Sequence, residues 1–225
     1  MQNTISKSFG AFLLGAAVLV SAQALASQDT KKDTGHTHKH SHSKSHEQND
    51  VQRGYFKDEQ IKPRPLTDWQ GDWQSIYPYL KDGTLDPVLK EKAAHGDKTI
   101  DECRAYYDSG FKTDVFRIDI NNDEVSFHEE GQVRHGRYVA DGTETLTYKK
   151  GNRGVRYIFK KVSGDAQAPD FIQFSDHKIA PAASGHYHLY WGSDRAELLK
   201  EVTNWPTYFP ASLTGQQILE EMLAH

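Results

Sequence analysis

The sequence predicts a mainly β protein with flanking helices, whose short antiparallel strands close into a small barrel or pack as a sandwich. From Asp114 onward, apolar and polar residues alternate with a period of two, which is typical of half-buried strands. Gly, Asn and Asp separate these strands at short intervals, as tight turns require. Closure or packing is expected because the open edges of antiparallel sheets invite aggregation.

Helices are expected before the strands. Thr67 or Asp68 can cap a helical segment whose apolar residues recur at spacings of three and four. These residues are Trp69, Trp73, Ile76, Tyr77 and Leu80. Two more short helices are expected at 85–94, where Pro87 lies in the first turn, and at 99–108.

The strands are expected to follow in chain order. Residues 115–120 and 124–129 predict a hairpin around Asn121, Asn122 and Asp123. Further strands are expected at 136–140, 145–150, 155–162, 171–175 and 186–191, which brings the number to about seven. The chain returns to helix at 194–203 and 214–225.

A pair of histidines in the last predicted strand is the strongest functional signal. His186 and His188 stand two residues apart, and His177 lies nine residues before His186. Side chains two apart in a strand point to the same face and are about 7 Å apart along it. A third imidazole from the preceding loop would complete a three-histidine set that suits Zn²⁺ and leaves one coordination position open. The alternative is a structural pair of satisfied or solvent-facing histidines.

A second group of histidines lies near the other end of the chain. Five of the twelve histidines fall within eleven residues: His36, His38, His40, His42 and His46. The surrounding residues are too polar to bury enough apolar surface for folding, so residues 27–53 are expected to form a disordered tail. His-rich tracts of this kind are candidates for binding divalent metals, whereas the alternative is a solvated linker with accidental histidines.

The first 26 residues predict export. Lys7 precedes a short apolar run at 11–20, and Ala24, Leu25 and Ala26 form a small-x-small cleavage site. A signal peptide cleaved after Ala26 is therefore expected, and no later apolar stretch is long enough for membrane insertion of the mature chain. The alternative is an uncleaved anchor helix.

Charge and cysteine content exclude several classes of function. The formal net charge of −4 does not suit a polyanion, so no nucleic-acid partner is expected. Cys103 is the one cysteine, which excludes an internal disulfide and any zinc site built from cysteine pairs. Because the segment around it reads as helical, burial of Cys103 is expected.

Several of these features together resemble a known family. Gly71, Asp72 and Trp73 are similar to the G-x-W signature of lipocalins, and Asp176 and His177 are followed by the apolar run at 185–192 that holds His186 and His188. With the signal peptide and the His-rich tail, this pattern resembles the ZinT (YodA) family of bacterial periplasmic zinc- and cadmium-binding proteins. The resemblance covers essentially the whole mature chain and implies a calycin/lipocalin-like antiparallel barrel over residues 54–225.

The resemblance also implies a function. It implies a periplasmic protein that binds Zn(II) near the barrel mouth through His177, His186 and His188, and it implies no enzyme activity. The protein would capture zinc under scarcity and assist its delivery to a zinc ABC importer by way of the importer's periplasmic solute-binding component. Imidazole ligands discriminate poorly among borderline metals, so Cd(II), Ni(II) and Cu(II) are further candidates.

Two functions of other classes stay open. An open three-histidine site is also the metal shell of a zinc hydrolase or hydratase, and a lipocalin-like barrel could carry a small organic ligand. The fourth metal ligand is undetermined: water is the default, with His225, Glu221 or a tail histidine as alternatives. Asp176 is expected either to accept a hydrogen bond from a ligand imidazole or to be a turn residue.

The remaining histidines are not expected to bind metal. His95 ends a predicted helix, and His128 and His135 lie on or beside predicted strands as surface residues. Glu129 and Glu130 are expected to lie in a solvated turn.

Overall fold

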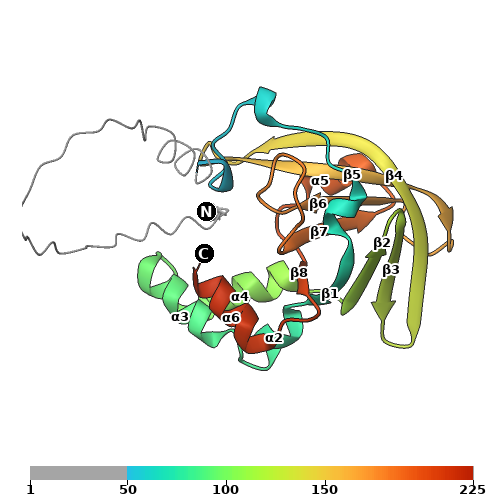
Figure 1. Cartoon of the computed structure of the whole chain (residues 1–225). Helices are drawn as coiled ribbons and strands as arrows, with labels where there is room; N and C mark the ends of the chain where they lie inside the picture. The colour runs from blue at the N-terminus through green and yellow to red at the C-terminus, as the bar shows by residue number, and fades with distance from the viewer. Residues whose placement is uncertain (1–49, 225) are drawn as a thin grey trace, which may run out of the picture.

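The computed structural model describes residues 50–224, in which eight antiparallel strands form a closed barrel with helices beside it (Figure 1). Neighbouring strands in the sequence are neighbours in the sheet, and β1 pairs with β8 to close it. The strands are β1 Gly71–Ser75, β2 Arg117–Asn121, β3 Glu124–Glu129, β4 Gln132–Thr147, β5 Arg153–Gly164, β6 Phe171–Ser175, β7 Tyr187–Gly192 and β8 Thr207–Pro210. The expected barrel is confirmed.

The predicted helix around Trp73 is wrong. The chain forms a 3-10 turn, η2 Leu66–Trp69, then β1, and only then a short helix, α2 Tyr77–Lys81. Trp73 lies in β1 opposite Ile118 of β2, with its ring in the barrel core. The apolar residues recur at spacings of three and four because the inward-facing residues of β1 are followed directly by the buried residues of α2. Pairing of β1 with its neighbouring strands overrides this helical pattern.

Two other strand predictions need correction. The segment at 136–140 and the first three residues of the segment at 145–150 belong to one strand, β4, which shifts register between Ala140 and Thr143 instead of turning back; residues 148–150 lie between β4 and β5. Gly142 lies at this shift with φ 93°, as expected for a bulge that bends a barrel strand. β8 was not expected at all, because its four residues carry too little pattern to separate them from a loop. The hairpin of β2 and β3 is confirmed, and Asn122 occupies its turn with φ 55°.

The helices lie where the sequence placed them, apart from α2. Two of them, α3 Asp86–His95 and α4 Ile100–Phe111, pack against each other. Thr99 and Glu102 form a capping box at the start of α4, which satisfies backbone donors of its first turn. The short helix α5 Arg195–Lys200 follows β7, and α6 Gly215–Ala224 packs on α3. η1 Asp58–Gln60 precedes η2, and residues 50–53 form a helical turn before it.

The molecule has two separate hydrophobic cores. One fills the barrel, where Trp69 stacks on Phe174 at 4.7 Å between ring centroids and packs edge-on against Phe159. The other joins α2, α3, α4 and α6 to the outer wall of the barrel through Phe209 of β8. Cys103 is buried in this second core as a free thiol, as expected. The outer wall of β8 therefore meets the helices in the region that Figure 1 shows between barrel and helical cluster.

Within residues 50–224, no helix is both long and apolar enough to cross a bilayer.

Candidate metal centre

The strand β7 presents one predicted ligand on the outer wall of the barrel. Tyr187 and Leu189 point into the barrel core, so His188 between them points outward. Its neighbours across the sheet are Ser175 of β6 and Thr207 of β8. His188 therefore lies on the outer wall of the barrel beside these two residues.

The other two histidines come from the loop that joins β6 to β7. His177 follows the end of β6 by two residues, and His186 immediately precedes β7. The expectation that His186 lies within the strand is thus wrong by one residue, yet its ring still reaches the same side as His188. His177 has φ 63°, a left-handed backbone conformation that is uncommon for a residue with a Cβ atom.

The three rings form a nearly equilateral triangle. The ring centroids are 5.9 Å apart for His177 and His186, 5.8 Å for His177 and His188, and 6.1 Å for His186 and His188. All three side chains are half-buried, so a metal ion could still reach them from solvent. The predicted three-histidine set is therefore gathered at one place.

The triangle is slightly wider than a metal-bound site. Tetrahedral zinc with Zn–N bonds of 2.0–2.1 Å would place the ring centroids about 5 Å apart. In keeping with this difference, no set of three His, Cys, Asp or Glu side chains among residues 50–224 already has the geometry of a bound metal. Three neutral imidazoles nevertheless suit Zn²⁺, and each ring centroid would have to move inward by about 0.5 Å to match Zn–N bonds of that length.

A hydrogen bond fixes which nitrogen of His188 is available. The Thr207 hydroxyl lies 2.8 Å from His188 Nδ1 and donates its one proton to the Trp205 carbonyl at 2.9 Å. Because the carbonyl can only accept, both contacts are satisfied together when the hydroxyl donates to it and accepts from Nδ1. The Nε2 lone pair of His188 is then left for a metal, which is the usual arrangement for a ligand histidine.

The surroundings of His188 favour its neutral form. Burial, followed by the charges of His177, His186 and Arg156, holds the pKa of His188 well below its ordinary value. Burial acts on the ring although part of the side chain reaches the surface. Because a metal binds only neutral imidazole, His188 needs no deprotonation step at neutral pH.

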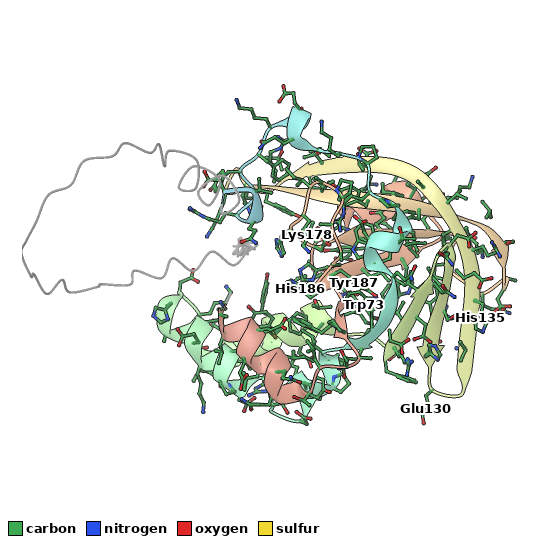
Figure 2. The ribbon with its side chains drawn as sticks, viewed as in Figure 1. Trp73, Glu130, His135, Lys178, His186 and Tyr187 are labelled. Atoms are coloured by element: carbon green, nitrogen blue, oxygen red, sulfur yellow. The ribbon has the colours of Figure 1, made fainter. Side chains whose placement is uncertain are left out.

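His186 packs on the second core. Its ring lies flat on Phe209, with 5.0 Å between centroids and 12° between planes. Phe209 belongs to the apolar cluster of the helices, so this stack couples the site to the helical side of the molecule. Figure 2 shows His186 on the side of the barrel that faces the helices.

Asp176 has an unexpected main partner. Instead of serving chiefly a ligand imidazole, its carboxylate forms a bidentate pair with the Arg64 guanidinium at 2.5 and 3.0 Å. The sequence did not predict a role for Arg64, because Arg64 lies 112 residues before Asp176. No local pattern signals a contact over that separation.

The remaining candidates divide into two groups. His95 ends α3, His128 contacts Asp119 at 2.7 Å, and His135 contacts Ser126 at 2.9 Å, all away from the triangle. Glu221 is exposed on α6. The tail histidines His36, His38, His40, His42 and His46, together with His225, lie outside the described residues.

Glu129 does not lie in a purely solvated turn. It ends β3 and pairs with Arg134 and Gln132, and both side chains of the Arg134 ion pair are largely covered. Glu130 lies in the turn between β3 and β4. The ion pair with Arg134 joins the two strands of that hairpin, so Glu129 has a structural role there.

Comparison with known proteins places this chain in a family. The model of the ZinT (YodA) family, described as periplasmic lipocalin-like zinc-recruitment, matches residues 47–225. The probable metal-binding protein YrpE of Bacillus subtilis is 54% identical over 176 residues, which cover 78% of this chain and 70% of YrpE. The zinc-binding lipoprotein AdcA of Streptococcus pneumoniae is 48% identical over 177 residues, which cover 78% of this chain but 35% of AdcA.

Solved structures agree with this assignment. The crystal structure of the Zn(II)-bound ZinT-like domain of Streptococcus pneumoniae AdcA superposes with a TM-score of 0.75 at 46% identity, covering 77% of this chain and 97% of that domain. The Zn(II)-bound AdcA of the same species superposes with a TM-score of 0.76 at 47% identity, covering 78% of this chain and 38% of that one. This chain therefore corresponds to about a third of AdcA, and it belongs to the ZinT (YodA) family of periplasmic, lipocalin-like zinc-recruitment proteins.

Proposed function

We propose that this protein captures Zn(II) with His177, His186 and His188 and assists its delivery to a zinc ABC importer. The observation that carries the proposal is the triangle of three imidazoles with centroids 5.8–6.1 Å apart on the outer wall of the barrel. The zinc-binding names of related proteins and the zinc-bound structures of AdcA support the choice of metal. Zinc is the cargo of the protein in this proposal and leaves it again.

The same donors would accept other metals. Three imidazoles and one open position hold Cd(II), Ni(II) and Cu(II) as well as Zn(II), because neutral imidazole is a borderline ligand. We propose that metal availability decides the occupant. The fourth ligand is proposed to be water.

The first test is a zinc titration by calorimetry. The background protein has its five tail histidines changed to serine, so that only the folded part binds. In this background we compare the unchanged triangle with a triple alanine variant of His177, His186 and His188. The matched control changes His95, His128 and His135 to alanine instead. Loss of one tight site in the first variant alone supports the proposal, whereas equal binding in all three proteins contradicts it.

We also propose a role for the tail. After removal of a signal peptide at Ala26, the His-rich tail is proposed to raise the local concentration of zinc near the folded site. Deletion of residues 31–46 should then slow zinc uptake at limiting zinc while the affinity of the folded site is unchanged. An unchanged uptake rate would remove this role.

Delivery is a separate proposal. The partner is proposed to be the periplasmic solute-binding component of the importer, which would take zinc from the loaded protein. Mixing zinc-loaded protein with the metal-free partner should transfer zinc faster than free dissociation allows. A transfer rate equal to the rate of free dissociation would exclude direct delivery.

A binding role is proposed in preference to the two other classes. Aromatic side chains occupy the barrel interior, with Trp69, Phe159 and Phe174 in mutual ring contact within 5.9 Å, which leaves this region packed rather than hollow. Such packing is unfavourable for a carrier of organic ligands in the barrel. Esterase and carbon dioxide hydration assays of the zinc-loaded protein test the enzyme alternative, and we expect rates no higher than those of the triple alanine variant.

A further inference from the structure

We propose that Arg64 is a positioning residue for the metal centre, because it fastens the loop that carries His177 to the barrel. The inference rests on the proposed ligand set of His177, His186 and His188. Arg64 itself does not belong to that set. It would act through the backbone of the loop between β6 and β7.

The contacts of Arg64 reach several points of this loop. Its guanidinium holds both carboxylate oxygens of Asp176 and also donates to the carbonyl oxygens of Lys178 and Ala182, at 3.4 and 2.7 Å. These three residues bracket His177 and continue past it. One planar cation therefore ties together both sides of a residue whose backbone is in the uncommon left-handed conformation.

Arg64 is itself held in one orientation. Its Nε donates to Asp68 at 2.7 Å, and its guanidinium lies 4.1 Å from the ring centroid of Trp69 and 5.1 Å from that of Tyr157. The side chains of Arg64 and Asp176 are both fully buried. A buried, bidentate and stacked arginine leaves little freedom to the groups that it binds.

The neighbouring backbone strengthens the same connection. The Asp68 carboxylate accepts from Ala182 N at 2.9 Å, Asp68 O accepts from Ser184 N at 2.8 Å, and Lys62 N donates to Ile179 O at 2.8 Å. Residues 62–68 thus hold the loop between β6 and β7 at several points, and this segment with its contacts to the loop is called the clamp below. Figure 2 shows Lys178 of this loop beside the side of the barrel that holds His186.

This arrangement determines how much ordering zinc binding requires. A ligand on a free loop would have to be ordered by the metal, which weakens affinity. With the clamp, the ring centroid of His177 already lies 5.8–5.9 Å from the centroids of its two partners before any metal binds. Loss of the clamp should therefore lower zinc affinity without removing any ligand.

The test compares Arg64→Lys with a matched control in the complete chain, with its five tail histidines changed to serine. Lysine keeps the charge but cannot hold the carboxylate and two carbonyls together. The control is Tyr138→Phe, which removes a buried hydrogen bond to the Pro169 carbonyl inside the barrel. We expect Arg64→Lys to weaken zinc binding by about tenfold or more, as loss of outer partners does elsewhere, and Tyr138→Phe to leave it unchanged.

The same variant in a His177→Ala protein separates a positioning role of Arg64 from general destabilisation of the fold. If Arg64 acts through His177, Arg64→Lys should have no further effect on zinc affinity in a His177→Ala protein. It should also shift the visible spectrum of the Co(II)-loaded protein in the same direction as His177→Ala does. An equal loss of affinity in both backgrounds, or the same affinity as Tyr138→Phe, would overturn the inference.

Two more variants are informative if Arg64→Lys does not fold or if the proposed ligand set is wrong. If Arg64→Lys does not fold, Asp68→Asn weakens the same clamp from its partly exposed side and should give the same pattern, and full affinity in this variant would overturn the inference. If His177→Ala alone leaves zinc affinity unchanged, the proposed ligand set fails and this inference with it. A loss in His177→Ala without a loss in Arg64→Lys overturns the inference alone.

Discussion

The two faces of β7 carry opposite chemistry on the same six residues. Its inward face, with Tyr187 and Leu189, fills the barrel core and excludes water, whereas its outward face places His188 beside two other imidazoles. Since alternate residues of a strand point to opposite sides, one short segment can stabilise the fold and bind a ligand independently. The candidate site therefore lies on the barrel wall, and the barrel interior acts as its scaffold.

The largest expected effect comes from the inward face. Leu189→Ala should lower the free energy of unfolding by about 2–5 kcal/mol, because it leaves a cavity in a packed core. Zinc affinity of the protein that remains folded should change by less than about threefold, on the order of 0.6 kcal/mol. Urea unfolding and zinc titration measure the two quantities. A large loss of affinity with an intact fold would mean that the two faces are not independent.

The outward face should show the reverse. His188→Ala should reduce zinc affinity by at least about a hundredfold, roughly 2.7 kcal/mol, because one of three ligands is lost. The free energy of unfolding without metal should change by less than about 1 kcal/mol, as for substitutions outside the packed core. His128→Ala is the control, since it also removes a half-buried histidine from the barrel surface. Equal zinc affinity in the two variants would exclude His188 as a ligand.

A smaller effect is expected from the partner of His188. Thr207→Val keeps the shape of the side chain but removes the oxygen that accepts from His188 Nδ1. The ring then loses its preferred tautomer and orientation, so zinc affinity should fall by about tenfold, roughly 1.4 kcal/mol. Thr143→Val on β4 serves as the control. Calorimetry that finds the same affinity in both threonine variants would refute the tautomer argument.

The smallest effect concerns pH and the protein without metal. The pKa of His188 is lower in the folded state than its ordinary value of about 6.5, so the unfolded chain binds a proton more readily. The neutral ring therefore contributes stability above about pH 6.5, and this contribution is lost as pH falls through the folded pKa. The slope for one proton is limited to about 1.4 kcal/mol per pH unit, and partial exposure should reduce it further.

Urea unfolding between pH 7.5 and 5.5 checks this sign. Chelator-treated protein should lose stability as pH falls, and His188→Gln should lose less over the same range because glutamine does not titrate. A steeper loss in His188→Gln than in the unchanged protein would contradict a lowered pKa of His188.

Local patterns were sufficient where the structure is locally determined. The strand Phe171–Ser175 and the helix that begins after Thr99 lie where the sequence placed them. The hairpin of β2 and β3 also follows from its alternation and turn residues. Residues close in sequence carry these signals, so no knowledge of distant contacts is needed.

Sequence patterns failed where pairing with a strand far away in the chain determines the secondary structure of a segment. Trp73 was assigned to a helix, although pairing with β2 and β8 makes its segment a strand. β8 is too short to be recognised without its partners β1 and β7. In each case the hydrogen bonds that define the element come from residues far away in the chain.

By itself, the sequence determined that this is a chain of short antiparallel strands with a His-x-His pair and a third histidine nearby, because strand alternation and residue spacing are local properties. Only the tertiary structure decided that His188 faces outward, that Thr207 selects its free nitrogen, and that Arg64 holds the loop of His177. Those features depend on contacts between segments that barrel closure brings together, and burial gives the contacts their strength.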